Sequence, residues 1–324
     1  MNSNYKREDF TNSTEVRWCP GCGDYAILAA LQRLLPELGL APEKHVFVSG
    51  IGCAGRLPYY MNTYGFHTIH GRATAVATGL KAMREDLTVW VITGDGDALS
   101  IGGNQLIHCL RRNVNVNILL FNNQVYGLTK GQFSPTSQKG QITKTSPQGV
   151  SNEPINPVAL ALAAGATFVA RAVDKDPNHL GLILKKAYEH QGTSFVEIYQ
   201  DCNIFNHGAF DAFAVKTNRA AKTIVLEEGQ PLFFGAEKEW ALTLKNDQLQ
   251  TVAGNEESLY CHDSSNFIAA SRLSRLHFPE FPVPLGVYYQ QQREVLNLSK
   301  KSQKTLADLP ELFRSRASWQ QGRG

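Results

Sequence analysis

The sequence predicts an α/β fold built on a mostly parallel, doubly wound sheet with helices on both of its faces. Between residues 24 and 200, short β-branched runs alternate with helical stretches rich in alanine and leucine, which is the pattern of βαβ units. Two of the strand-like runs end in short polar turns, and the carboxyl edge of such a sheet is where ligands bind. The chain has 324 residues and is 43% hydrophobic, enough to bury a sizeable core.

The elements follow in order along the chain. A helix over 24–38 comes first, with Asp24 as its expected N-cap, and the strand 45–50 ends at a glycine. We expect further helices at 72–84, 98–112, 156–165 and 177–190, and further strands at 87–94, 114–123, 166–173 and 193–199. The regular alternation stops after about residue 203.

This change divides the chain into a ligand-binding domain over 1–210 and an irregular C-terminal extension over 211–324, expected to pack on the core and on a partner subunit. Residues 291–324 hold seven Lys/Arg against three Asp/Glu, typical of a solvated tail or of a segment that wraps a partner. A net charge of +3 does not indicate a nucleic-acid partner. No apolar run approaches a membrane span and the N-terminus is polar, so we expect a cytoplasmic protein without membrane contact.

The strongest local signal is the segment GDGDALSIGGNQLIHCLRRNVNVNILLFNN. One strand ends in Gly94-Asp95-Gly96 and the next ends in Asn122-Asn123, so both polar groups are expected at the same sheet edge. The glycines let the backbone approach a phosphate, and the helix that follows favours an anion at its N-terminus. Carboxylate and amide oxygens suit Mg²⁺ bound to a diphosphate. The spacing between the two motifs matches the thiamine diphosphate signature.

His70 opens the segment HGRATAVATGLKAM, which continues as a helix of small residues. The free N–H groups at the start of this helix are expected at the same sheet edge. Alone, His70 would be interpreted as a structural histidine. Beside the diphosphate motif, a contact between His70 and the cofactor is an equal alternative.

Four cysteines lie in loops at the ends of predicted elements, which allows the chain to bring their thiolates together: Cys19, Cys22, Cys53 and Cys202. Four thiolates suit zinc or a [4Fe–4S] cluster. Zinc sites usually use two close pairs, whereas this chain has one pair and two single cysteines, which favours the cluster. A redox-active dithiol at Cys19–Cys22 is the alternative, but no strand precedes that pair.

Taken together, WCPGCG, SGIGCAGR, YGFHTIHGRA, GDGDALSIGGNQLIH, NNQVYGLTKGQFSPTS and QDCNIFN resemble the β subunit of the 2-oxoacid:ferredoxin oxidoreductases, in that subunit's order, over about residues 15–210. The bacterial 2-oxoglutarate enzymes look most similar. The resemblance implies a thiamine diphosphate-binding fold and oxidative decarboxylation of 2-oxoglutarate to succinyl-CoA and CO₂. It also implies one-electron steps through a [4Fe–4S] cluster to ferredoxin, with coenzyme A as the acyl acceptor.

The resemblance further implies roles for matching positions. Cys19, Cys22, Cys53 and Cys202 would hold one [4Fe–4S] cluster. Asp95 and Asn123 would bind Mg²⁺ by their side chains and Val125 by its carbonyl. The cofactor would lie against Gly52, Cys53, His70, Gly71 and Gly94, with Gly96 and Asp97 at its diphosphate. Arg56 and Lys130 would lie near the 2-oxoacid.

No glutamate beside these motifs is a convincing activator of the cofactor's aminopyrimidine, and in the family the other subunit supplies it. We therefore expect an α subunit that provides this glutamate and part of the coenzyme A site, in an αβ heterodimer or its dimer. Three rival interpretations stay open: the same chemistry on pyruvate or a branched-chain 2-oxoacid, a non-redox thiamine diphosphate decarboxylase, and a zinc-stapled scaffold that binds a nucleotide.

Overall fold

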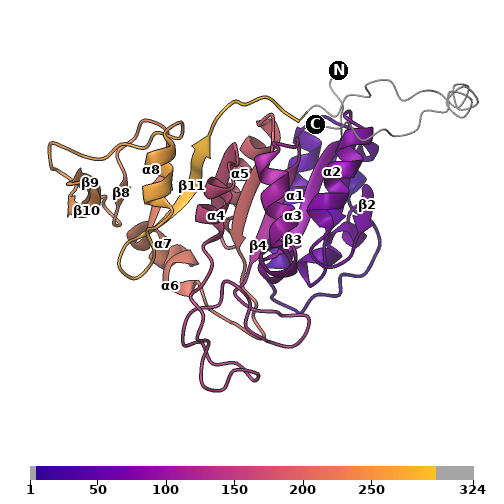
Figure 1. Ribbon diagram of the computed structural model, residues 1–324, viewed down its shortest axis with the longest axis horizontal. Helices are drawn as coiled ribbons and strands as arrows, with labels where there is room; N and C mark the ends of the chain where they lie inside the picture. The colour runs from indigo at the N-terminus through magenta and orange to yellow at the C-terminus, as the bar shows by residue number, and fades with distance from the viewer. Residues whose placement is uncertain (1–4, 297–324) are drawn as a thin grey trace, which may run out of the picture.

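The computed structural model describes residues 5–296 and centres on an eight-stranded sheet of order β2-β1-β3-β4-β6-β5-β11-β7 (Figure 1). Its strands are β1 (His45–Ser49), β2 (Tyr64–His67), β3 (Thr88–Gly94), β4 (Asn117–Asn122), β5 (Phe168–Val173), β6 (Ser194–Tyr199), β7 (Thr223–Leu226) and β11 (Val283–Gln290). Neighbours are parallel from β2 through β5, while β11 is antiparallel to β5 and parallel to β7. The predicted mostly parallel α/β sheet is confirmed.

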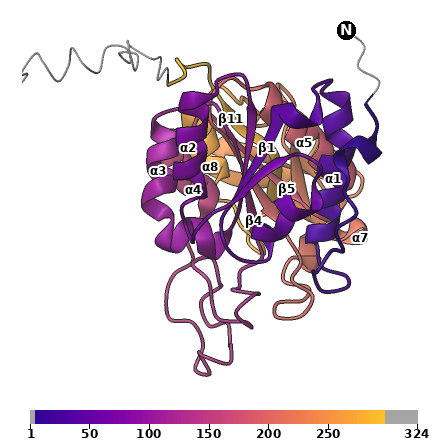
Figure 2. The same cartoon turned by 90° about the vertical axis from the view of Figure 1, so that its right-hand side faces the viewer.

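Helices cover both faces of this sheet, as Figure 2 shows for α2, α3 and α4 on one side and α1 and α5 on the other. The first group is α2 (Ala73–Met83), α3 (Gly103–Arg111), α4 (Pro157–Ala163) and α8 (Phe267–Leu273); the second is α1 (Asp24–Glu37) and α5 (Pro177–Glu189). Shorter elements are η1 (Arg7–Phe10), η2 (Pro42–Lys44), η3 (Ala54–Tyr60), α6 (Asp211–Ala214) and α7 (Lys216–Lys222). None of the described helices has the length and apolar character that a membrane crossing requires.

The central strand β4 explains why both faces are covered. Its side chains alternate between the two cores: Ile118 and Leu120 pack with α2 and α3, whereas Leu119 and Phe121 pack with α1 and α5. A strand that is apolar on both faces must be buried on both, which is typical of a parallel sheet. The polar residues that follow β4 are therefore held at a rigid edge.

Two local predictions need correction at this edge. The predicted helix 98–112 begins instead with a π-helical turn, η4 (Asp97–Ile101), and α3 starts only at Gly103. Such turns frequently occur at functional sites. Asp24 is not the N-cap of α1, because Gly23 takes that position and the Asp24 side chain is buried.

The C-terminal extension is more regular than the sequence indicated. It supplies β7 and β11 to the main sheet and forms a small antiparallel sheet of β8 (Phe233–Phe234), β9 (Trp240–Lys245) and β10 (Gln248–Ala253). The sequence did not predict β11 because its first residues belong to a proline-rich run, and proline cannot donate a hydrogen bond within a sheet. Pro284 is tolerated because β11 pairs with β5 only from Gly286 onward, so Pro284 has β7 alone as a neighbour. The last part of the predicted extension, 297–324, lies outside the described residues.

His45 gives the fold a predicted sensitivity to acid. It is fully buried against Phe10 and Trp90, and burial lowers its pKa to about 4. An unfolded histidine titrates near pH ~6.5, so the unfolded chain binds the extra proton first. The free energy of unfolding should therefore fall as the pH drops from about 6.5 towards 4. Denaturant unfolding of His45→Gln across this pH range should show a smaller loss of unfolding free energy than the unmodified protein shows. An equal dependence on pH in both proteins would contradict the role given to His45.

Candidate active site

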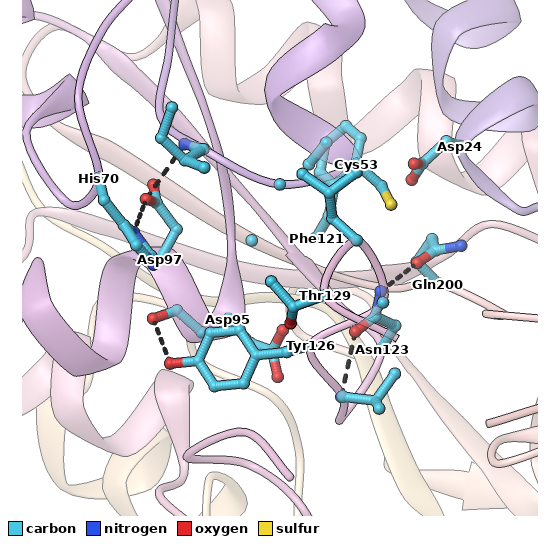
Figure 3. A pocket seen from close by; sticks show the side chains of 18 residues that line it. Asp24, Cys53, His70, Asp95, Asp97, Phe121, Asn123, Tyr126, Thr129 and Gln200 are labelled. Atoms are coloured by element: carbon cyan, nitrogen blue, oxygen red, sulfur yellow. Dashed lines mark hydrogen bonds and ion pairs between the residues drawn. The ribbon is translucent and has the colours of Figure 1, made fainter. Parts of the chain in front are cut away.

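A cavity lies at the carboxyl ends of β1, β3, β4 and β6 (Figure 3). The predicted residues that line it are Gly52, Cys53, His70, Gly94, Asp95, Gly96, Asp97, Asn123 and Val125. Arg56 lines a neighbouring cavity of about 500 Å³, which shares Ile51, Gly52 and Leu128 with the first. Lys130 is exposed on the loop after β4 and lines neither cavity. The sheet edge therefore brings most of the predicted residues together, and Lys130 lies apart from them.

Asp95 follows β3 and is only 2% exposed. Its Oδ2 accepts hydrogen bonds from Ser134 Oγ and Thr136 Oγ1, both at 2.5 Å. Burial raises the pKa of Asp95 to about 6, and the two hydroxyl donors oppose that rise. The loop that carries these hydroxyls ends the segment NNQVYGLTKGQFSPTS, which carries part of the family resemblance, but its hydroxyl side chains were not predicted to belong to the site. This loop orients the carboxylate at the cavity.

Residues 122–125, which we call the asparagine turn, begin at Asn122, the last residue of β4. Asn122 Oδ1 accepts from the Gln124 N–H at 3.2 Å, and Asn123 Oδ1 accepts from the Val125 N–H at 3.1 Å. Gln124 has a φ of 58°, a left-handed conformation that side-chain acceptors of this kind stabilise. The turn therefore presents the Asn123 amide and the Val125 backbone to the cavity.

Asp97 connects three segments around the cavity. Its Oδ1 accepts from the backbone N–H groups of Ile51 and Gly71 at 3.1 and 2.8 Å and lies 2.5 Å from His70 Nδ1. Its Oδ2 accepts from Thr93 Oγ1 at 2.7 Å. The carboxylate is thus fully engaged within the protein. His70 both lines the cavity and pairs with Asp97, so its structural contact coexists with access to a ligand.

A buried ion pair lies beneath the asparagine turn. Glu197 on β6 is 0% exposed, and its Oε2 accepts from Arg171 Nε on β5 at 2.7 Å. Its Oε1 accepts from Asn122 Nδ2 at 2.7 Å, which fixes the orientation of that amide. Arg171 Nη1 donates to Tyr288 Oη on β11 at 2.7 Å. A chain of hydrogen bonds therefore runs from the C-terminal strand to the asparagine turn.

The four predicted cysteines are all free thiols. A Cβ placed on Gly127 would lie 3.5 Å from Cys202 Sγ and 3.7 Å from Cys53 Sγ, so these two sulfurs flank one glycine. Burial raises the pKa of Cys53 to about 12 and raises that of Cys22 further. Among the described residues, no three His, Cys, Asp or Glu side chains are close enough to hold one metal ion.

Nine further lining residues were not predicted as part of the site, and four of them carry polar side chains: Asp24, Tyr126, Thr129 and Gln200. Tyr126 Oη donates to the Gly96 carbonyl at 3.0 Å, and its ring packs so close that a Cβ on Gly96 would lie 2.2 Å from it. Both carboxylate oxygens of Asp24 are buried without a hydrogen-bond partner in the described part of the chain. Burial raises the pKa of Asp24 to about 7.

Residues 50–198 match the family of thiamine pyrophosphate enzymes, C-terminal TPP binding domain. Over 306 residues the chain is 51% identical to 2-oxoglutarate oxidoreductase subunit KorB of Mycobacterium tuberculosis, covering 92% of this chain and 81% of that protein. It is 49% identical over 189 residues to 2-oxoacid:ferredoxin oxidoreductase 1, subunit beta, of Aeropyrum pernix, covering 58% of this chain and 59% of that protein.

Among solved structures, the fold is similar to 2-oxoglutarate:ferredoxin oxidoreductase from Magnetococcus marinus, determined with 2-oxoglutarate, coenzyme A and succinyl-CoA bound. The TM-score is 0.74 at 35% identity, covering 98% of this chain and 93% of that chain. The matched residues include the ends of β3 and β4 and all the residues that line the cavity except Asp24 and Gln200. The chain therefore belongs to the family of thiamine diphosphate-dependent 2-oxoglutarate oxidoreductase beta subunits.

Proposed function

We propose that this chain is the cytoplasmic beta half of an enzyme that converts 2-oxoglutarate and coenzyme A to succinyl-CoA and CO₂ and passes the electrons to ferredoxin. One observation carries the proposal. Cys53 lines the same cavity as Asp95 and Asn123, while its sulfur lies beside Cys202 across Gly127. A redox centre held by these cysteines would adjoin the cofactor pocket.

The oxygen donors at the cavity fit Mg²⁺. Asp95 offers one carboxylate, Asn123 an amide oxygen and Val125 a backbone carbonyl, all hard ligands of the kind Mg²⁺ prefers. Diphosphate oxygens and water would complete the octahedral shell. Gly94 and Gly96 would let the backbone approach the diphosphate closely. Asp97, with four donors around it, would hold the surrounding loops in place rather than ligate the metal.

The thiols fit an iron–sulfur cluster. Buried thiols with raised pKa values form thiolates only where a cation compensates their charge, and iron supplies that charge. Cys19, Cys22, Cys53 and Cys202 would each ligate the cluster. A cluster of this kind accepts and donates single electrons. Gly127 leaves the space between Cys53 and Cys202 open for it.

The α subunit would complete the active site. In the described part of the chain, the carboxylates that line the cavity all belong to aspartates, and we propose that the activating glutamate comes from the α subunit together with part of the coenzyme A site. Arg56 would approach the carboxylate of the 2-oxoacid from the neighbouring cavity, which Arg17 and His67 also line. Lys130 would act on the substrate only if the complex brings its exposed loop to the site.

The test is to co-express the chain with its α partner, purify the complex without oxygen, and measure iron, sulfide and thiamine. We expect about four iron and four sulfide per chain. The visible absorbance should bleach with 2-oxoglutarate plus coenzyme A, and not with pyruvate or branched-chain 2-oxoacids. Thiamine without iron would instead indicate a non-redox decarboxylase, and zinc without thiamine would indicate a nucleotide-binding scaffold.

Glu197→Gln is expected to weaken Mg²⁺ binding without touching a ligand. Arg171 can only donate, so the new amide must turn its oxygen to Arg171 and its NH₂ to Asn122. Asn122 must then flip, which sets its NH₂ against the Gln124 N–H and opens the asparagine turn. Loss of this kind of support typically raises a metal dissociation constant about tenfold or more.

Calorimetric titration of Mg²⁺ into the complex with thiamine diphosphate measures this constant. Arg219→Met is the matched control, since it breaks a half-buried ion pair with Asp176 that lies outside the cavity. The control should lose stability and retain its affinity for Mg²⁺. Equal losses of affinity in both variants would show that Glu197 acts only through general stability.

A further inference from the structure

Gln200 lies between the asparagine turn and the cysteine thiols. It follows the last residue of β6 and is 1% exposed. Its Oε1 accepts a hydrogen bond from Asn123 Nδ2 at 2.9 Å, the bond drawn in Figure 3. Its Nε2 donates to the Asp201 carbonyl at 2.6 Å and to Cys22 Sγ at 3.3 Å. Both ends of this buried amide therefore have partners.

These partners fix which way each amide points. The carbonyl of Asp201 can only accept, so the nitrogen of Gln200 must face it and the oxygen must face Asn123. Asn123 must then present its nitrogen to Gln200, which leaves its Oδ1 beside the Val125 N–H. Because only the oxygen of an amide ligates Mg²⁺, Gln200 selects the metal-binding orientation of Asn123.

The second hydrogen on Nε2 is directed at sulfur. A hydrogen bond to a cysteine sulfur stabilises the additional negative charge of a reduced cluster and so raises its reduction potential. The site is buried, so the surrounding low dielectric strengthens this bond. The same side chain thus touches one proposed ligand of Mg²⁺ and one proposed ligand of the cluster.

We propose that Gln200 is a positioning residue that couples the two centres: it orients the Asn123 oxygen toward Mg²⁺ and raises the reduction potential of the cluster through Cys22. This inference rests on the function proposed above. It predicts that one substitution changes a metal affinity and a redox potential together. A residue that only filled space would change neither quantity specifically.

Two variants of the anaerobic αβ complex separate the two effects. Gln200→Met removes all three hydrogen bonds of the side chain, including the one to Asn123, so the Mg²⁺ dissociation constant should rise about tenfold. The one-electron equilibrium of the cluster should shift about tenfold towards the oxidised form, which lowers the midpoint potential by about 59 mV. Gln200→Glu keeps an acceptor for Asn123 and loses the amide nitrogen that donates to Cys22 and to the Asp201 carbonyl. It should therefore lower the potential while the affinity for Mg²⁺ stays near that of the unmodified complex.

The potential is measured by redox titration with electron paramagnetic resonance detection, and the affinity by calorimetry. Gln32→Met is the matched control, because Gln32 is a buried amide of α1 bonded to Arg7 and the Tyr60 carbonyl. It should change neither quantity. If Gln200→Met has its full iron content but an unchanged reduction potential or an unchanged affinity for Mg²⁺, the inference about Gln200 is wrong and the proposed cluster stands. An unmodified complex without iron overturns the cluster assignment and this inference together.

Discussion

Gly127→Ala is expected to abolish assembly of the proposed iron–sulfur cluster while the chain remains folded. The new methyl group would lie 3.5 Å from Cys202 Sγ and 3.7 Å from Cys53 Sγ, which is ordinary contact distance for the metal-free protein. Gly127 is not among the residues with positive φ, so alanine fits its backbone conformation. The methyl group would occupy the space between two proposed cluster ligands, Cys53 and Cys202, and there it would exclude iron and sulfide.

Iron and sulfide analysis of the anaerobic complex checks this result, with thiamine content and circular dichroism measured on the same sample. We expect iron to fall to background and thiamine binding to remain. Gly181→Ala is the matched control, since a Cβ on that glycine of α5 would meet no atom within 4 Å and Gly181 does not line the cavity. Full iron content in Gly127→Ala would place the cluster elsewhere.

Asp95→Asn is expected to produce the largest loss of cofactor affinity. The substitution keeps the shape of the side chain and its contacts with Ser134 and Thr136, but it removes the only anionic protein ligand proposed for Mg²⁺. Substitution of a residue that only hydrogen-bonds to a metal ligand typically lowers metal affinity about 10–100-fold. Removal of the charged ligand itself should therefore raise the Mg²⁺ dissociation constant at least about a hundredfold.

The same variant should be more stable than the unmodified protein when both lack cofactor and metal. Burial raises the pKa of Asp95 to about 6, so the folded chain holds a proton that the unfolded chain releases at lower pH. Ionisation of the buried carboxyl therefore lowers the free energy of unfolding. This loss is absent below about pH 4, grows up to about pH 6 and is constant above it, with an upper bound of about 3 kcal/mol. Denaturant unfolding in a metal chelator at neutral pH should show the gain. A loss of stability would mean that the carboxylate is structural.

The sequence predicted the sheet because its central strands are apolar runs between helical segments, and it predicted the cavity because parallel strand ends share one edge. Asp95 and Asn123 meet there although β3 and β4 place them on separate loops. The local sequence pattern is sufficient to predict the sheet and the position of the cavity. They depend on the order of elements and on which residues directly follow each strand.

The supporting contacts could not be predicted in the same way. Thr136 reaches back 41 positions to Asp95, and Gln200 reaches back 178 positions to Cys22. Nothing in the local sequence sets such pairings, since they depend on how loops pack over the finished sheet. Single charges inside apolar strands, such as Arg171 and Glu197, were a usable signal because an unpaired charge is rarely buried. The predicted position of Lys130 near the substrate rested on a motif match, which does not determine which way a loop side chain faces.

The place of β11 in the sheet has a consequence for biosynthesis. The hydrogen-bond chain beneath the asparagine turn ends at Tyr288, which lies 117 residues after its partner Arg171. At ordinary rates of translation the ribosome needs on the order of ten seconds to make that interval. During this time Arg171 lacks its aromatic and hydroxyl neighbours on β11, and β5 is an open edge. We therefore expect the proposed metal site to form only after the C-terminal strand has been synthesised, and chains that stop before β11 to leave the ribosome without this support for the asparagine turn.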